Sequence, residues 1–232
     1  MLQKVHFKDL GSVEYGEAWK YQESLLFENT DIKNQIASGS ADSTTSHHLL
    51  FCEHPPVYTL GKSGKEEHVL VSKEELAKRN IAYYETNRGG DITFHGPGQI
   101  VGYPILDLEK YYRDIGRYLR SLEEVIILTL AEYEIKGERS KGETGVWIDP
   151  ENKMKARKIC AMGVRCSRWV TMHGFALNVN TNLEYFTMIV PCGIADKQVT
   201  SLEKELGKQV DIAEVKEILI SKFEEVFECE VS

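Results

Sequence analysis

The chain has 232 residues, of which 42% are hydrophobic and 28% charged, and its formal net charge is −8. This composition predicts a globular protein with one sizeable core, and the acidic balance disfavours binding to nucleic acid or to an anionic membrane. There is no apolar run of membrane-spanning length, no signal-peptide pattern and no C-x-x-C spacing among the five cysteines, so the expected location is the cytoplasm.

The first half of the chain predicts helices that alternate with short strands. A strand is expected over residues 5–10, and apolar residues at helical spacing predict a long amphipathic helix over 15–36. The polar segment 38–46 is then a surface loop and not a domain boundary. Ser72 and Glu75 have the spacing of a capping box, which predicts a short helix. Short strands are predicted at residues 48–52, 57–60, 81–85, 92–94 and 100–106.

The second half predicts two more helices with strands between them. Apolar spacing indicates a helix over residues 114–133, and Asp211 caps a last amphipathic helix that runs to about residue 227. Strands are predicted at 145–148, 157–165 and 169–179, with a turn at 149–152.

Short turns join several of these strands, and few strands are separated by a full helix. The expected fold class is therefore α+β, with a mixed, largely antiparallel sheet covered by helices. Without a composition shift or a linker, residues 1–232 are expected to form a single domain.

A glycine-rich string between two predicted strands is the most specific feature of the sequence. It reads Arg-Gly-Gly-Asp-Ile-Thr-Phe-His-Gly-Pro-Gly-Gln from Arg88 to Gln99. Two glycines after an arginine offer bare N–H groups beside one fixed cation, and glycine lets a ligand approach the main chain closely. The string predicts a binding loop, whereas two glycines alone would favour a plain hairpin turn.

Cys192 lies between a proline and a glycine, on a turn that can present its sulfur to a cleft. Most cysteines are instead small buried hydrophobic residues. A nucleophilic thiol needs a base, because only a few per cent of it is thiolate at neutral pH. Lys158 lies in an apolar strand pattern, where partial desolvation lowers a lysine pKa, and it fits equally a side chain that snorkels from a strand edge. His173 and His95 are alternatives, each either a base or a structural histidine.

The remaining cysteines and histidines predict no further site. Cys52, Cys160 and Cys166 lie in predicted strands and fit small buried residues, and Cys229 is expected in a fraying C-terminus. The seven histidines lack metal-ligand spacing, so no metal is expected. Neither the P-loop nor the dinucleotide-binding glycine motif is present, and no cofactor is expected.

These motifs resemble the signature of the lipoyl(octanoyl) transferases, a family similar in fold to the catalytic domains of biotin- and lipoate-protein ligases. The signature is matched at Arg88, Gly89, Gly90, Thr93, Phe94, His95, Gln99 and Tyr103. Three further strings occur in the family's order, namely Lys-Ile-Cys-Ala-Met-Gly from Lys158, His-Gly-Phe-Ala-Leu-Asn-Val from His173 and Pro-Cys-Gly around Cys192. The resemblance covers residues 50–205, whereas the N-terminal helix and the loop 38–46 have no match.

The resemblance implies transfer of an octanoyl group from octanoyl-acyl carrier protein to a lysine of a lipoyl domain. The implied acceptors are the lipoyl domains of 2-oxoacid dehydrogenase complexes and the glycine cleavage H protein. Cys192 would carry the octanoyl group as a thioester, and Lys158 would be its base. The implied acyl pocket is lined by Arg88, Gly89, Gly90, Asp91, Ile92, Thr93, Phe94, His95, Ala161, Met162, Gly163, Gly174, Phe175 and Ala176.

Two other functions stay open at this point. An ATP-dependent lipoate-protein ligase has the same fold, although such ligases lack the Pro-Cys-Gly nucleophile. A non-catalytic protein that binds carrier proteins or lipoyl domains would retain the glycine loop without the chemistry.

The charge pattern also predicts where an acidic partner docks. From residue 153 to residue 183 the chain has no Asp or Glu, and it carries six basic residues: Lys153, Lys155, Arg157, Lys158, Arg165 and Arg168. Because the chain and its implied partners are both acidic, a local basic patch would help them meet.

Overall fold

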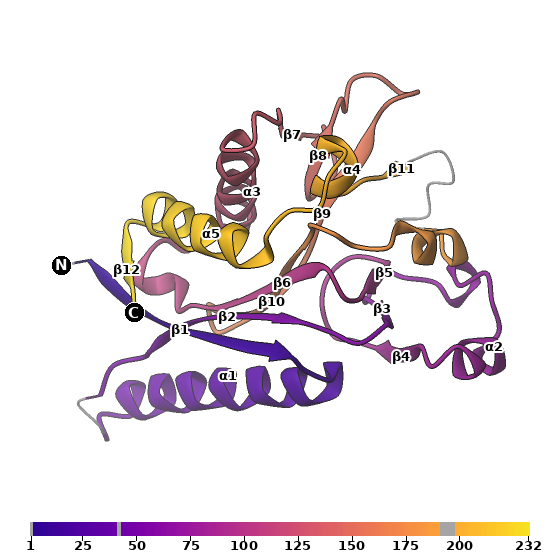
Figure 1. The fold of residues 1–232 in the computed structure, drawn as a ribbon. Helices are drawn as coiled ribbons and strands as arrows, with labels where there is room; N and C mark the ends of the chain where they lie inside the picture. Colours follow the sequence, from indigo (N-terminus) through magenta and orange to yellow (C-terminus); the bar gives the residue numbers. More distant parts are fainter. Residues whose placement is uncertain (1, 41–42, 191–197) are drawn as a thin grey trace.

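The structure is a computed structural model that describes residues 2–40, 43–190 and 198–232. A large mixed sheet forms its centre (Figure 1). In spatial order its strands are β12 (Cys229–Val231), β1 (Gln3–Ser12), β2 (His47–Glu53), β6 (Gln99–Ile105), β10 (Val170–Asn178), β9 (Arg157–Ser167), β8 (Val146–Ile148) and β7 (Glu138–Arg139), with β11 (Gln198–Val199) beside β9.

Pairing in this sheet is antiparallel from β2 across to β7. It is parallel where β12, β1 and β2 meet and where β11 joins β9. The α+β fold class with a mixed, largely antiparallel sheet is therefore confirmed.

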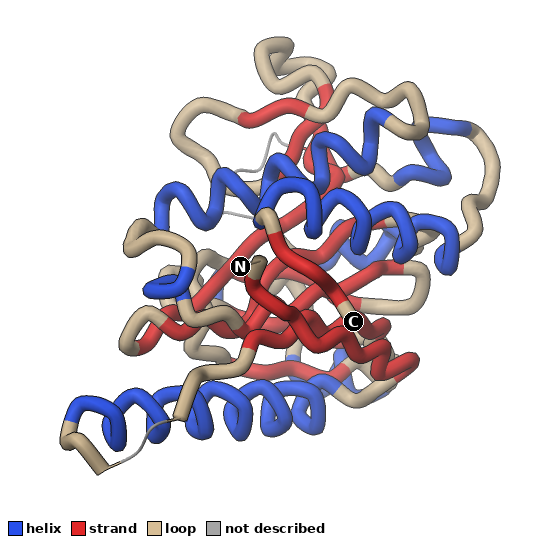
Figure 2. The backbone as a smooth tube through the Cα atoms, turned by 90° about the vertical axis from the view of Figure 1, so that its left-hand side faces the viewer, coloured by secondary structure: helices blue, strands red, loops and turns tan. Residues whose placement is uncertain are grey.

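Helices cover both faces of the large sheet (Figures 1 and 2). The long helix α1 (Tyr15–Ala37) packs on one face against β10 and β6, while α3 (Ile115–Ala131) and α5 (Ile212–Phe227) pack together on the other. The middle of strand β2, residues 49–52, is apolar because successive side chains enter opposite, equally covered faces. Thus Leu49 joins the core under α3 and α5, and Leu50 joins the core under α1.

The predicted helix starts follow from side-chain capping. Asp114 accepts a hydrogen bond from the Arg117 N–H at the start of α3, and Ser72 caps α2 (Lys73–Lys78) in the same way. Asp211 caps α5 as expected. None of the described helices combines the length and the apolar character that a bilayer crossing needs.

A second, three-stranded sheet lies beside the large one. It consists of β4 (Ala82–Glu85), β3 (Val57–Leu60) and β5 (Ile92–His95), and its core includes Tyr58 and Phe94. The turn at residues 86–91 between β4 and β5 reaches across to the large sheet. The two sheets meet there, and this contact positions the site.

Several short elements were not predicted. They are α4 (Leu202–Leu206), β7, β11, β12 and the 3₁₀ turns η1 (Glu66–His68), η2 (Leu108–Lys110) and η3 (Leu183–Met188). The expectation of a fraying end at Cys229 is wrong, because β12 pairs with β1 and leaves Cys229 only 6% exposed. Its partner Gln3 is far away in sequence, so local patterns carry no sign of this pairing.

Candidate active site

A cavity of about 720 Å³ lies between the turn at residues 86–91 and the large sheet. This volume is within the roughly 300–1,000 Å³ typical of small-molecule sites. The predicted site residues that line it are Arg88, Gly89, Gly90, Asp91, Ile92, Thr93, His95, Lys158, Ala161, Met162, Gly163, Gly174, Phe175 and Ala176.

Phe94 was predicted to line the pocket, but it is absent from the residues that line the cavity. Its ring is buried in the core of the small sheet, where it stacks on Tyr185 with ring centroids 4.5 Å apart. Side chains on a strand point alternately to opposite faces, so Phe94 must face away when Thr93 and His95 face the cavity.

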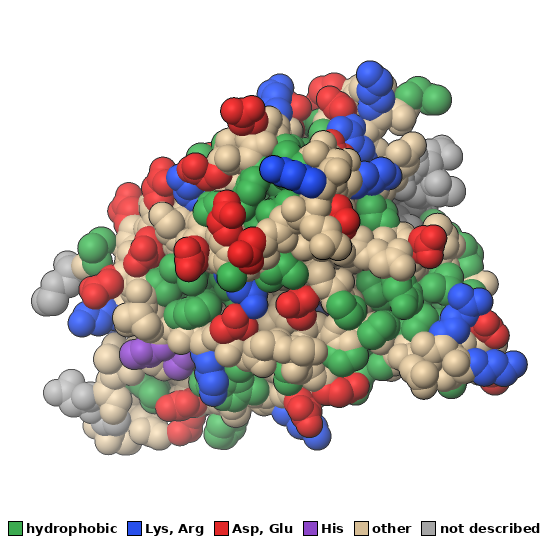
Figure 3. All heavy atoms as spheres, viewed as in Figure 1, with side chains coloured by type: hydrophobic (Ala, Val, Ile, Leu, Met, Phe, Trp, Pro, Cys, Tyr) green, Lys and Arg blue, Asp and Glu red, His purple; other side chains and the backbone are tan. Residues whose placement is uncertain are grey.

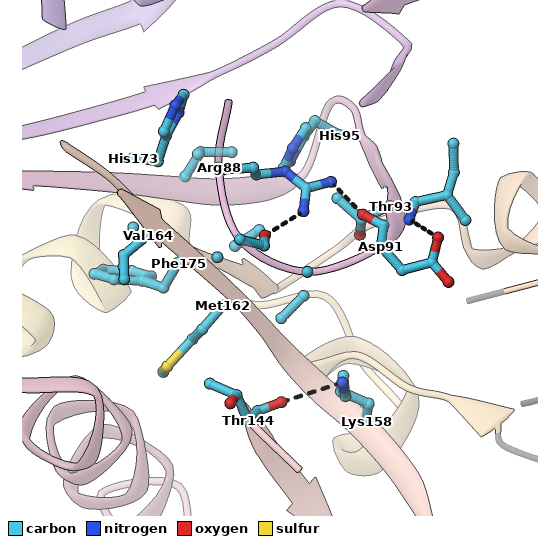
Figure 4. Close-up of a pocket in the computed structure, with 18 of the residues that line it drawn as sticks. Arg88, Asp91, Thr93, His95, Thr144, Lys158, Met162, Val164, His173 and Phe175 are labelled. Atoms are coloured by element: carbon cyan, nitrogen blue, oxygen red, sulfur yellow. Dashed lines mark hydrogen bonds between the residues drawn. The ribbon is translucent and has the colours of Figure 1, made fainter. Parts of the chain in front are cut away.

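Arg88 holds the turn in place with its own guanidinium group (Figure 4). Nη2 donates to the Thr59 carbonyl at 2.5 Å and to the Asp91 carbonyl at 2.7 Å, and Nη1 donates to the Gly89 carbonyl at 3.0 Å. The side chain is only 7% exposed. The sequence predicts that this cation binds a ligand. In the structure the guanidinium instead donates to carbonyl groups of the turn and of β3.

Glycine is needed where the turn lies on the large sheet. The Gly89 N–H donates to the Val164 carbonyl at 2.9 Å, and Gly90 has a positive φ of 87°. A Cβ atom on Gly163 of β9 would lie 2.6 Å from the Gly89 oxygen. The turn can approach β9 this closely only because Gly163 has no side chain.

Small residues form the surface of the large sheet beneath the turn, which is the floor of the cavity. Ala161 is paired with Ala176, and Gly163 with Gly174, across strands β9 and β10. These side chains take up little space, so the cavity stays open where larger residues would fill it. The floor is therefore suited to a slender apolar chain.

His95 is held by polar neighbours on both ring nitrogens. Nδ1 lies 2.8 Å from Gln99 Oε1, and Nε2 lies 3.3 Å from Thr59 Oγ1. The Gln99 amide nitrogen donates to Asn178 Oδ1, so its oxygen faces His95 and Nδ1 carries the hydrogen. Burial lowers the pKa of His95 well below its usual value, with smaller contributions from His54 and Arg88. These contacts favour a structural histidine.

His173 is also kept neutral. Its Nε2 lies 2.7 Å from Asn87 Oδ1, and its backbone N–H donates to Gln22 Oε1. Burial, followed by the charges of Arg88 and Arg165, lowers the pKa of His173 to about 3. A base with so low a pKa is a poor acceptor for the proton of a thiol, so His173 is a weaker candidate for the base than the sequence allows.

Lys158 lies at the other end of the cavity, near the start of β9. Its Nζ donates to the Thr144 carbonyl at 3.2 Å and lies 4.6 Å from the centre of the Trp147 ring (Figure 4). On β9, Lys158 is six residues from Val164, which pairs with His173. At about 3.3 Å per residue, the two ends of the site are roughly 20 Å apart along the strand.

Cys192 lies outside the described residues. The described chain before it ends at Val190, whose N–H donates to the His68 carbonyl, and His68 Nδ1 lies 2.6 Å from Asp91 Oδ2. The chain is described again at β11, where Val199 pairs with Lys158. Both flanks of the undescribed segment are therefore anchored beside cavity-lining residues.

The other four cysteines are free thiols. Cys52 and Cys160 are fully buried, as predicted, and Cys166 is partly exposed on β9. Burial raises the pKa of each of the four thiols, Cys229 included. Among the described residues, no three His, Cys, Asp or Glu side chains are grouped as metal ligands would be.

Sequence reasoning missed several residues that line the cavity. Tyr15 comes from α1, Ile115 and Leu119 from α3, and Glu143 and Thr144 from the loop before β8. The two helices show only the ordinary amphipathic pattern. Thr144 contributes its carbonyl, which every residue has, so no sequence signal marks it.

The six basic residues between 153 and 168 do not form one patch. Arg157 is paired with Asp149 and Glu205, with nitrogen–oxygen distances of 2.6 Å to each. Strand β9 separates Lys153 and Lys155 from Arg165 and Arg168 by about 30 Å, at about 3.3 Å per residue. Basic side chains do gather at the upper right in Figure 3, in the region where Figure 1 places the β8–β9 hairpin. The prediction of a single basic surface is wrong because a strand spreads its residues in space.

Comparison with known proteins agrees with this geometry. The chain matches the family model of the lipoyl protein ligase A/B catalytic domain over residues 14–224. It is 56% identical over 232 residues to the octanoyltransferases of Christiangramia forsetii and Flavobacterium johnsoniae, covering 100% of this chain and 99% and 100% of theirs.

The fold is also similar to solved lipoate-ligase structures. A bi-partite lipoate protein ligase from Thermoplasma acidophilum superposes with a TM-score of 0.70 at 18% identity, covering 100% of this chain and 86% of that one. This likeness confirms the predicted ligase-like catalytic fold. The chain belongs to the lipoyl protein ligase A/B catalytic-domain family and, within it, to the octanoyltransferases, which are acyltransferases.

Proposed function

We propose that this octanoyltransferase moves an octanoyl group from octanoyl-acyl carrier protein to a lysine of a lipoyl domain through a thioester on Cys192. The acceptors we propose are the lipoyl domains of 2-oxoacid dehydrogenase complexes and the glycine cleavage H protein. The observation that carries the proposal is an apolar, small-residue cavity with the Lys158 amine at one end.

The first half-reaction forms the acyl-enzyme. Lys158 accepts the proton of the Cys192 thiol, and the thiolate attacks the thioester carbonyl of the donor. The carbon–sulfur bond to the carrier breaks, and the carrier thiolate regains a proton from Lys158. One thioester replaces another, so the step is nearly balanced and needs no ATP.

The second half-reaction uses the lysine amine of the lipoyl domain. That amine attacks the Cys192 thioester, and an amide forms as the carbon–sulfur bond breaks. Lys158 accepts the proton that the amine loses and returns one to Cys192. Amide formation from a thioester is downhill, which drives the transfer forward.

The shape of the cavity supports recognition of a saturated chain. Ala161, Gly163, Gly174 and Ala176 leave room for the chain, and the turn at residues 86–91 covers it. Burying an eight-carbon tail contributes about 4–6 kcal/mol at about 0.8 kcal/mol per methylene. Seven carbon–carbon bonds of about 1.5 Å span at most about 11 Å, so the tail fits within the length of the site.

The decisive experiment is intact-mass analysis after incubation with octanoyl-acyl carrier protein. The wild type and the control Cys166→Ser should each gain one octanoyl group that hydroxylamine removes, and Cys192→Ala should gain none. An adduct that persists on Cys160 or Cys166 in the Cys192→Ala variant would refute the assignment. ATP-dependent pyrophosphate exchange with octanoate would instead favour a lipoate-ligase reaction.

A further inference from the structure

Glu123 of α3 is a fully buried acidic side chain next to the Lys158 end of the cavity. It is 0% exposed, and burying a carboxylate is costly unless it is paired and hydrogen-bonded. Its Oε2 accepts from Arg120 at 2.6 Å and from Arg139 at 3.1 Å. Its Oε1 accepts from the backbone N–H of Gly145 at 3.0 Å. Both oxygens therefore have hydrogen-bond partners: Oε2 binds the two arginines, and Oε1 binds the main chain.

The Gly145 N–H and the Thr144 carbonyl belong to the same peptide group. A trans peptide is planar, and its N–H and C=O point in opposite directions. Within this plane, the N–H donates to Glu123 at one edge, and the carbonyl at the opposite edge accepts from Lys158 Nζ at 3.2 Å. A continuous hydrogen-bonded line thus runs from the buried carboxylate through one rigid peptide to the amine.

This peptide has little freedom to turn. Gly145 has a φ of 109°, a conformation that favours glycine, and a Cβ atom there would lie 2.5 Å from the Cys160 carbonyl oxygen. The peptide is therefore pressed against β9, the strand that carries Lys158. The Trp147 ring lies 4.6 Å from Nζ and limits the amine further.

We propose that Glu123 is a positioning residue, which aims the Lys158 amine into the cavity by fixing the Thr144–Gly145 peptide. The inference rests on the proposed role of Lys158 in acyl transfer. Fixing one N–H of the amine sets the directions of its other bonds, and a proton can move only along those directions. Arg120 and Arg139 offset the charge of Glu123, so it acts through geometry.

Three variants separate geometry from charge. Glu123→Leu removes the acceptor for the Gly145 N–H. Glu123→Gln loses the charge and keeps one acceptor oxygen. This oxygen can stay on the Gly145 N–H, because Arg120 and Arg139 are partly exposed and can turn from the amide NH2 toward solvent. The matched control is Glu124→Gln, since Glu124 is the next residue on α3 and pairs with Arg139 but has no bond to Gly145.

The first readout is single-turnover acylation by an octanoyl thioester over a range of concentration and pH. Glu123→Leu should lower the saturating rate about tenfold to a hundredfold, leave the half-saturating concentration unchanged and shift the pH profile. Glu123→Gln and Glu124→Gln should stay within about threefold of wild type with the same profile. Equal losses in Glu123→Leu and Glu123→Gln would overturn the proposal, because they would assign the effect to charge.

The second readout is the ε-nitrogen resonance of Lys158 in ¹⁵N-labelled resting enzyme, assigned by its loss in Lys158→Arg. Wild type and Glu123→Gln should share one slowly exchanging signal, and Glu123→Leu should move it toward those of exposed lysines. If Glu123→Leu does not fold, Glu123→Asp replaces it, because the shorter side chain withdraws the oxygen from Gly145. An unchanged resonance and rate in the folded Leu or Asp variant would refute the proposal.

These readouts also separate this inference from the proposed function. A wild type that forms no octanoyl adduct would refute the function, and the resting-state resonance would still decide whether Glu123 fixes the amine.

Discussion

The two ends of the cavity differ in the polar groups that they contain. At the turn, Arg88 and His95 are bonded to neighbouring protein groups, and burial keeps His95 and His173 neutral. At the other end, the Lys158 amine donates to the Thr144 carbonyl in the loop before β8. This difference is consistent with the proposed function, in which the turn shapes the space for the acyl chain and Lys158 transfers protons.

The largest expected effect is at the lysine end. Lys158→Arg keeps the positive charge but cannot exchange protons near neutrality, because the guanidinium pKa is above about 12. Single-turnover acylation should fall by about 10²–10⁴-fold while thermal unfolding barely changes. Lys155→Arg, on the neighbouring hairpin, is the control and should retain full activity. Near-normal turnover in Lys158→Arg would remove the contrast between the two ends.

The next effect tests the floor beneath the turn. In Gly163→Val, the added Cβ atom would lie 2.6 Å from the Gly89 oxygen. Either the turn must move away, or the valine side chain must take up space in the cavity. Acylation should fall by at least about tenfold, with about 1–3 kcal/mol lost in the free energy of unfolding. Gly207→Val, strained by its φ of 69° at the end of α4, should lower stability without lowering the rate per folded molecule. Full activity in Gly163→Val would mean that the turn is only structural.

A third test asks whether Arg88 mainly holds the turn. Arg88→Met removes the guanidinium donor to the Thr59 carbonyl and one of the two donors to the Asp91 carbonyl, which also accepts from the Gly61 N–H. The loss should cost about 2–4 kcal/mol in denaturant unfolding. Arg79→Met is the control, because its helix-surface pair with Glu75 is worth at most about 0.5 kcal/mol. Equal stabilities of the two variants would contradict the role assigned to Arg88.

The effect that is smallest at each step is a pH dependence of stability, because it is spread over several pH units. The pKa of His173 is lowered to about 3 in the folded protein, so between about pH 3 and pH 6.5 the unfolded chain binds the extra proton. The free energy of unfolding should therefore fall as the pH falls through this range. His173→Gln should reduce this slope by about 1 kcal/mol per pH unit. The matched variant His47→Gln should do the same down to about pH 4, where the pKa of His47 lies. Parallel curves for wild type and His173→Gln would contradict the burial argument.

The long elements can be predicted from the sequence because their periodicity is local. The helix predicted over residues 15–36 is α1 at Tyr15–Ala37, and the capping residues Asp114 and Asp211 mark two further helix starts. Helix α4 was missed although its signals are present, since Ser201 caps it and Gly207 ends it in a left-handed conformation. Its five residues are too few for a periodic pattern.

The sequence predicted most of the residues that line the cavity, but it did not predict their contacts with one another. The glycine string identifies the turn, yet nothing in the sequence shows that Arg88 bonds to Thr59 from another strand. Glu123 has the pattern of an ordinary helix residue, because its partners Arg139 in β7 and Gly145 in the loop before β8 come much later in the chain. Long-range contacts of this kind depend on the folded arrangement, which a single sequence does not display.

The burial of the four described cysteines has a consequence for the proposed thioester chemistry. Acyl groups pass between thiols through attack by a thiolate, and burial raises the pKa of Cys52, Cys160, Cys166 and Cys229. These sulfurs stay protonated at neutral pH and, Cys166 apart, are shielded from solvent. An acyl group held on this chain therefore has no competing thiolate among them to migrate to. A brief alkylation of the native protein should modify these four last, and the order of labelling then reports which sulfur is the reactive one.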